Sequence, residues 1–141
     1  MADITVTAAS VRPMPGAVIQ RYQAGEAMDI GTAVYLKSDG KVWKADADAA
    51  ASSMAIGLVV SAPNGATAAA ADDYVDVVVR GVVTGAASMT PGGLVYSSTT
   101  AGAVADASPA GSSGDYRWIV GYAVSATGIY VMPFTDNFAA L

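Results

Sequence analysis

The large apolar residues of this chain occur in short bursts of β-branched and aromatic side chains, each bounded by Gly, Pro, Ser or Asp. The strongest burst covers residues 74–79, in which four of the six residues are valine. Such residues pack stiffly on a pleated surface and form helices poorly. Similar bursts return at intervals of roughly 8–12 residues, as in antiparallel sandwiches and barrels. The sequence therefore predicts an all-β fold, a compact barrel or sandwich of short antiparallel strands.

Roughly nine or ten strands are predicted by this pattern. Pro13 and Pro15 cannot donate to a strand ladder, so residues 11–16 are predicted to form an extended connector or an edge. Two Ala-rich stretches, residues 46–54 and 66–71, are predicted to be loops with one helical turn each, and residues 99–115 a polar loop. The predicted strands are residues 4–7, 18–22, 33–36, 41–44, 74–79, 82–83, 94–96, 118–120, 122–124 and 129–132.

A Met-x-x-Gly-x-x-Val-Tyr unit occurs twice, 61 positions apart, and marks an internal repeat over residues 24–83 and 85–134. Glycine supplies positive φ in a turn, and Val-Tyr begins a strand with one side chain facing inward. Each copy therefore predicts a β-hairpin. The repeat indicates either a duplication into two related halves or shared hairpin chemistry without common origin. At this offset the matched pairs are Met28 with Met89, Gly31 with Gly92, Val34 with Val95, and Tyr35 with Tyr96. With one inserted residue Gly40 matches Gly102 and Val42 matches Val104, and with two more Gly57 matches Gly121.

Catalytic residue types are scarce in this chain, which contains no histidine and no cysteine. Ser-His and Cys-His pairs, thiol nucleophiles and Cys-based zinc sites are therefore excluded. The Gly-rich segment at residues 91–93 lacks the Lys-Ser/Thr pair of a phosphate-binding loop. We accordingly predict no catalytic, cofactor-binding or metal-binding residues, and a protein that is not an enzyme.

The aspartates of the first half are the remaining candidates for a charged site. Asp46 and Asp48, with Asp39 nearby, could be paired carboxylates or half of a calcium loop. A calcium loop needs further oxygen ligands and a closing Glu, and residues 49–54 supply neither. We interpret these residues as solvated loop carboxylates. Asp72 and Asp73, which precede a predicted strand, are interpreted as turn residues.

All three lysines, Lys37, Lys41 and Lys44, lie on the predicted hairpin that also carries Trp43. A positive spot with an aromatic side chain resembles a platform for single-stranded nucleic acid. Lysines on an exposed hairpin also prevent edge-to-edge pairing of sheets, and this is the interpretation that we favour. Contact with an acidic surface of a partner is a third alternative.

The charge and hydropathy of the chain bear on its partners. Only 13% of the residues are charged and 53% are hydrophobic, with a mean hydropathy of +0.43. We therefore expect part of the surface to be buried against other chains, as in a homo-oligomer. A net charge of −5 argues against direct binding of nucleic acid. The longest bulky apolar run, residues 55–60, is far shorter than the ~20 residues of a membrane span. No secretory signal is recognised at the N-terminus, so synthesis in the cytoplasm is expected.

Several segments resemble small virion proteins of tailed bacteriophages, in particular capsid decoration (cement) proteins. They are MADITVTAASV at the start, GAVIQRYQAGEAMDIGTAVYL, AIGLVV, GGLVY and IVGYAVS, so the resemblance covers nearly the whole chain. It implies a β-protein on the capsid exterior that binds the major capsid protein and stabilises the shell. A homo-oligomer is expected, with a trimer favoured. The resemblance also implies an extended N-terminal arm, for which residues 1–16 are the candidates, before a single β domain over residues 17–141.

Two other functions fit the same sequence. One is another phage structural component, a neck, tail or fibre-base protein with a small β fold. The other is a carbohydrate-binding β-module that uses Trp43, Trp118 and surface tyrosines as stacking platforms. The second requires both tryptophans to be exposed.

Overall fold

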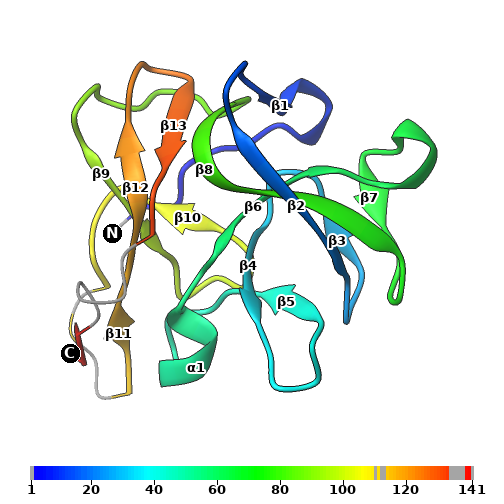
Figure 1. The fold of residues 1–141 in the computed structure, drawn as a ribbon. Helices are drawn as coiled ribbons and strands as arrows, with labels where there is room; N and C mark the ends of the chain where they lie inside the picture. Colours follow the sequence, from blue (N-terminus) through cyan, green and yellow to red (C-terminus); the bar gives the residue numbers. More distant parts are fainter. Residues whose placement is uncertain (1, 110, 112–113, 134–138, 141) are drawn as a thin grey trace.

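The computed structural model describes residues 2–109, 111, 114–133 and 139–140, which form mainly strands and turns (Figure 1). The all-β fold predicted from the sequence is confirmed, because a curled antiparallel sheet forms a half-barrel. The strands are β1 (Arg12–Pro13), β2 (Val18–Gln23), β3 (Met28–Asp29), β4 (Ala33–Leu36), β5 (Val42–Lys44), β6 (Gly57–Ser61), β7 (Ala68–Ala69), β8 (Tyr74–Thr84), β9 (Leu94–Ser97), β10 (Val104–Ala105), β11 (Tyr116–Arg117), β12 (Ile119–Ala123), β13 (Gly128–Val131) and β14 (Ala139–Ala140). The short helices are α1 (Ala50–Ser53) and two 3₁₀ turns, Ala8–Ser10 and Pro63–Gly65.

The long strand β8 organises the main sheet, whose order is β10-β9-β12-β13-β8-β6-β4-β5. The first part of β8 pairs with β2 and β6 at the same residues, so these two strands lie on its opposite edges. The second part pairs in the same way with β1 and β13. Figure 1 shows β8 as a long curved ribbon between the two groups of strands. Strand β8 therefore belongs to both halves of the chain.

The two sequence repeats have the same strand pairing. The first half is ordered β5-β4-β6-β8 and the second β10-β9-β12-β13. Val34 pairs with Gly57 in the first half, and the matched residues Val95 and Gly121 pair in the second. The turn glycines agree as well, because Gly31, Gly92, Gly40 and Gly102 all have positive φ, between 81° and 94°.

Matched residues of the two halves nevertheless face different clusters of buried side chains. Val34 and Val42 belong to an outer cluster, which β3 and β7 cover with Met28 and Ala69. Their counterparts Val95 and Val104 belong to the central cluster between the halves. The two sheets therefore pack with opposite faces of the repeat turned inward.

An irregularity in β8 accounts for this reversal. Val78 and Val83 both belong to the central cluster although they are five positions apart, an odd spacing that would separate them in a regular strand. Between them the register with β2 shifts, and Gly81 has a φ of +121°. A bulge of this kind adds a residue to one strand and re-aims the side chains beyond it.

The N-terminal segment, for which an extended arm over residues 1–16 was predicted, lies on the body of the protein. The backbone N–H of Ile4 donates to Val104 O at 2.8 Å, and that of Thr7 to Gly85 O at 3.0 Å. Val11 is only 1% exposed and belongs to the central cluster. Pro13 pairs at the edge of β8, where its missing N–H costs no ladder bond.

Strands β3, β6, β7, β10, β11 and β14 lie where no strand was predicted. Strand β6 occupies the apolar run at residues 55–60, β7 the Ala-rich stretch at 66–71, and β10 the predicted loop at 99–115. The helix α1 falls in the other Ala-rich stretch, as expected. The end of the second repeat, at residue 134, lies outside the described residues. In the described part of the chain, no helix reaches the length and apolarity that a membrane crossing requires.

Candidate interaction surfaces

No residue was predicted to bind a metal ion or to act in catalysis, and the acidic side chains are the remaining candidates for a charged site. Among the described residues, no three Asp or Glu side chains are placed so that they could hold a metal ion. A hollow of about 430 Å³ lies between the N-terminal segment and β3, and its charged lining residues are Asp29 and Lys44.

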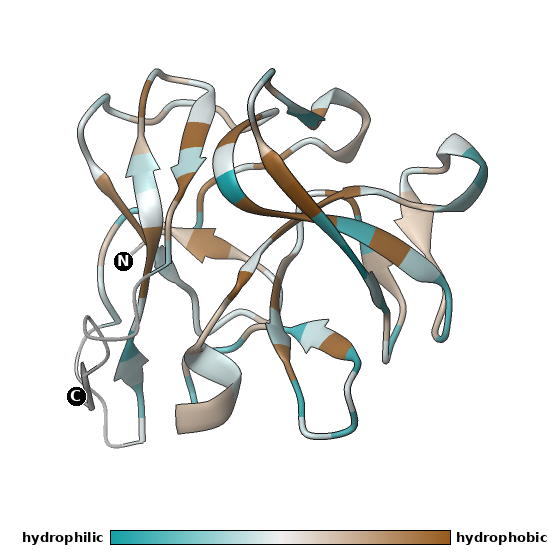
Figure 2. Ribbon diagram, viewed as in Figure 1, coloured by the Kyte–Doolittle hydropathy of each residue, from teal (hydrophilic) through white to brown (hydrophobic). Residues whose placement is uncertain are grey.

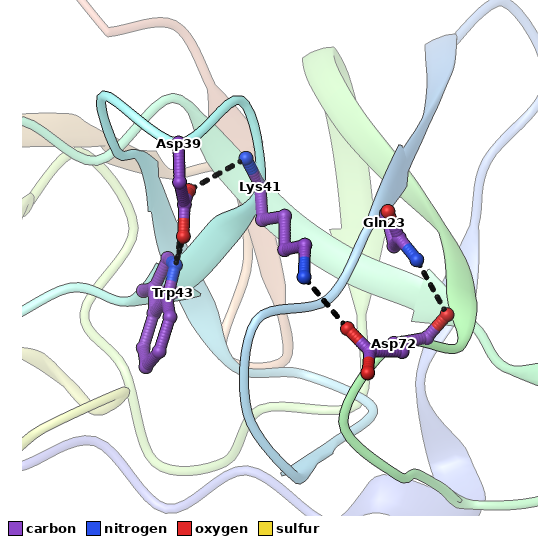
Figure 3. Close-up of polar contacts among 5 residues, drawn as sticks. All are labelled: Gln23, Asp39, Lys41, Trp43 and Asp72. Atoms are coloured by element: carbon purple, nitrogen blue, oxygen red, sulfur yellow. Dashed lines mark hydrogen bonds and ion pairs between the residues drawn. The ribbon is translucent and has the colours of Figure 1, made fainter.

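The hairpin β4–β5 carries the three lysines and Trp43, and Asp39 at its tip fixes the turn (Figure 3). The Lys41 backbone N–H donates to Asp39 Oδ1 at 2.9 Å, and Trp43 Nε1 donates to Asp39 Oδ2 at 3.1 Å. The backbone bond from Lys41 is the main cause that lowers the pKa of the Asp39 carboxyl. Lys41 Nζ reaches Asp72 Oδ1 at 2.7 Å.

These contacts occupy groups that a nucleic-acid platform on the hairpin would need. Lys37 Nζ lies 4.2 Å from the centroid of the Trp43 ring, so the ring already has a cation over it. The charge of Lys41 is paired with Asp72. Strand β5 is the last strand of the main sheet, so the lysines lie at an edge, where they discourage pairing with another sheet.

Trp118 is buried, which contradicts its predicted use as a carbohydrate platform. Its side chain is 3% exposed within the central cluster, and Nε1 donates to Ala55 O at 3.0 Å. A stacking platform must present a ring face to the ligand, and this ring presents none. The pair of tryptophans proposed for a carbohydrate-binding module is therefore not formed.

Asp46 and Asp48 form a turn near a third carboxylate, Asp115. The Asp48 backbone N–H donates to Asp46 Oδ1 at 3.2 Å. Burial is the main cause that raises the pKa of Asp46, and the negative charges of Asp48 and Asp115 raise it further. Asp72, with a φ of 71°, and Asp73, which accepts from Ala70 N, are turn residues as predicted. Asp46 and Asp48 therefore form a turn in which the carboxylates repel one another, rather than a ligand site.

The outer face of the second-half sheet carries a row of apolar and aromatic side chains, which we call the tyrosine face (Leu94, Tyr122, Tyr130 and Val82). Leu94 pairs with Tyr122, Tyr122 with Tyr130, and Tyr130 with Val82. Residues paired in this way project from the same face of the sheet. The two tyrosine rings are stacked, with centroids 5.3 Å apart and planes at 15°.

The tyrosine face is accessible, whereas the matching row of the first half is buried. Leu94 is 44% exposed, and Tyr122, Tyr130 and Val82 are half-buried. In the first half, the row at the matching positions of the sheet is Ala33, Leu58 and Val78, which correspond to Leu94, Tyr122 and Tyr130. All three residues of the first half lie in the central cluster. The opposite side of the second-half sheet is buried through Val95, Ile129 and Val83.

Sequence reasoning did not identify the tyrosine face, although a signal was present. Strands β9 and β13 have apolar residues at successive positions, such as Leu94-Val95 and Ile129-Tyr130-Val131. Apolar residues on both faces of a strand predict that both faces are buried. Only the inner face is buried within the described chain.

Comparison with known proteins adds no relative to these observations, because neither a protein family nor a curated protein matches the sequence. The assignment of a function therefore depends on the surfaces of the chain and on the resemblance of its sequence segments.

Proposed function

We propose that this chain is a structural virion protein, a bacteriophage capsid decoration protein that binds the outer capsid surface through its tyrosine face and stabilises the shell. The observation that carries the proposal is an accessible apolar row on a rigid sheet, in a chain without histidine or cysteine. The partner is the major capsid protein, and the site of action is the capsid exterior. On the capsid the decoration protein is expected to act as a homo-oligomer.

The chemistry of the tyrosine face suits a protein interface. Tyrosine is enriched at the centres of such interfaces, because it buries a large area with few rotatable bonds and keeps a polar hydroxyl. The strands beneath Tyr122 and Tyr130 are fixed by the central cluster, so docking costs little ordering of the backbone. A rigid platform of this kind fits a protein that reinforces a lattice.

The first residues of the chain supply a second contact in this proposal. Residues 2–7 are attached by strand-edge bonds, such as the bridges of Asp3 with Ala105 and Val6 with Ala86, and by the packing of Ile4 and Val6 against the central cluster. These bonds are of the kind that a neighbouring strand can replace. Release of residues 2–7 would let them reach an adjacent capsomer, whereas Val11 must stay in the central cluster.

Binding to expanded capsids of the phage that encodes the chain tests the tyrosine face. We expect Tyr122→Ala to weaken binding by about 10–100-fold, since a central interface tyrosine contributes about 2 kcal/mol or more. Tyr74→Ala is the matched control, because Tyr74 is 60% exposed on β8, outside the tyrosine face. Equal affinity of the two variants would exclude the tyrosine face as the docking site.

Deletion of residues 2–7 tests the second contact. The shortened protein loses the packing of Ile4 and Val6, so its fold is verified by circular dichroism. It is expected to bind, but to raise the heat resistance of capsids less than the full chain does. Unchanged capsid heat resistance would remove these residues from the mechanism.

A neck, tail or fibre-base protein is the second candidate. It would use the same apolar face within a ring of roughly six to twelve copies, because tail rings have that symmetry. The number of copies per particle separates the two candidates.

A further inference from the structure

Strand β2 differs from the other long strands of the described chain because four successive residues of it are exposed. Its residues Val18, Ile19, Gln20 and Arg21 are all exposed, on both faces of the strand. Val18 is 48% and Ile19 44% exposed, and Met14 just before them is 46% exposed. Figure 2 shows the first part of this strand as apolar and its end as hydrophilic.

The outer edge of β2 also has no strand beside it. Within the described residues, the backbone of Val18–Gln23 makes hydrogen bonds only with β8. The remaining N–H and C=O groups of the strand therefore point to solvent. An exposed edge with apolar side chains is a template for pairing with a further strand.

The other edges of the sheet are protected, so the open edge of β2 is a specific feature. The hairpin that ends in β5 carries Lys37, Lys41 and Lys44. Strand β10 is two residues long, and Asp3 bridges it at Ala105. Strand β1 is also two residues long and contains Pro13. Within β2 there is no proline and no lysine.

We propose that β2 pairs with β2 of a second copy of this chain, antiparallel and about a two-fold axis, so that the two sheets become continuous. Such an axis stands perpendicular to the sheet, and one residue must therefore lie opposite its own copy. Gln20 opposite Gln20 keeps the longest overlap that does not place Arg21 opposite Arg21. In this register Ile19 lies opposite Arg21 of the other copy, and Val18 opposite Tyr22.

The single charge on β2 is compatible with this contact. Arg21 Nε lies 3.0 Å from Asp76 Oδ1 on the neighbouring strand of its own chain, so its charge is already paired. Its aliphatic stem is then free to pack against Ile19 of the other copy. The contact does not depend on the proposed capsid function, because it uses the β2 edge and leaves the tyrosine face open.

The pairing of one short strand buries less than the ~1,200 Å² of stable specific interfaces, so a weak dimer is expected. Sedimentation velocity over a range of concentrations would show the wild-type chain passing from monomer to dimer. Ile19→Lys is expected to weaken the dimer by at least about tenfold, because it opposes like charges across the pair. Val124→Lys, at a side chain that is 41% exposed outside β2 and the tyrosine face, is the control and should dimerise as the wild type does.

Ile19→Glu makes the test specific for the register. A carboxylate at this position lies opposite Arg21 of the other copy, so this variant should dimerise better than Ile19→Lys. A general charge effect predicts the reverse order, because the chain carries a net charge of −5 and lysine reduces it. Circular dichroism of each variant verifies that the fold is retained.

Single cysteines give an independent readout, since the chain contains none. Gln20→Cys is expected to form a disulfide-linked dimer under mild oxidation, whereas Ser38→Cys, exposed at the tip of the β4–β5 hairpin, should not. A wild type that stays monomeric, a trimer, dimerisation insensitive to Ile19→Lys, or equal cross-linking of the two cysteine variants would overturn the proposal.

Discussion

Gly57 and Gly121 hold matched positions in the two halves, and their replacement by alanine tests whether the halves share one strand register. A Cβ at Gly121 would lie 1.8 Å from Tyr130 O, and one at Gly57 would lie 2.0 Å from Val78 O, where ordinary contacts begin at 3.4 Å. The atoms in the way belong to the backbone of the paired strand, so no side chain can move aside. The same steric requirement, the absence of a Cβ beside the paired strand, therefore explains why both halves have glycine at this position.

The cost of either alanine combines two effects. Forcing a methyl group into a packed region costs about 1–3 kcal/mol, and a distorted ladder bond about 1 kcal/mol more. We therefore expect Gly57→Ala and Gly121→Ala each to lower the free energy of unfolding by about 2–4 kcal/mol. For a chain of this size this corresponds to a Tm lower by about 10 °C.

Urea unfolding followed by tryptophan fluorescence measures this loss, and an unchanged m-value shows that only stability has changed. Gly40→Ala is the control, because Gly40 has a φ of +82° and no atom within 4 Å of the added Cβ. Its cost should be only the strain of a left-handed alanine, about 1 kcal/mol. Variants at Gly57 and Gly121 that cost no more than this control would refute the steric reasoning.

Two further predictions concern charge and the core. A carboxyl whose pKa is raised by folding, as at Asp46, stabilises the fold most when protonated, so its contribution falls as pH rises from 3.8 through the folded-state pKa. Asp46→Asn should therefore raise the free energy of unfolding at pH 7. Urea titrations should also show that this free energy depends less on pH above 3.8 in the variant than in the wild type. A variant that is less stable than the wild type at pH 7 would contradict the reasoning. Trp118→Phe removes the bond to Ala55 O and leaves a buried acceptor unpaired, so we expect a loss of about 1–3 kcal/mol in the same assay. A loss below about 0.5 kcal/mol would show that this bond contributes little.

The strands were predictable because valine-rich bursts and turn glycines act locally. The shared register of Val34 with Gly57 and Val95 with Gly121 follows the sequence repeat directly. The reversal of faces in β8 was not predictable, because it depends on the bulge near Gly81, where a Cβ would lie 2.7 Å from Ala17 Cα. That close approach arises only when distant segments have paired.

The surfaces were harder to predict than the fold. Trp43 and Trp118 look alike in sequence, yet one lies on a sheet edge and the other is buried, because burial depends on which strands surround each residue. The same holds for residues 1–16, whose strand-like pattern does not reveal that Val11 completes the central cluster. The tyrosine face required knowledge of strand neighbours, since Tyr122 and Tyr130 are eight positions apart.

The number of copies of this chain per virion tests the proposed function most directly. Quantitative mass spectrometry of purified particles, with the major capsid protein as the internal reference, gives that number. A decoration protein predicts on the order of hundreds of copies, in fixed proportion to the capsid subunit. Absence from the particle, or a count of roughly six to twelve as in a tail ring, would contradict the account.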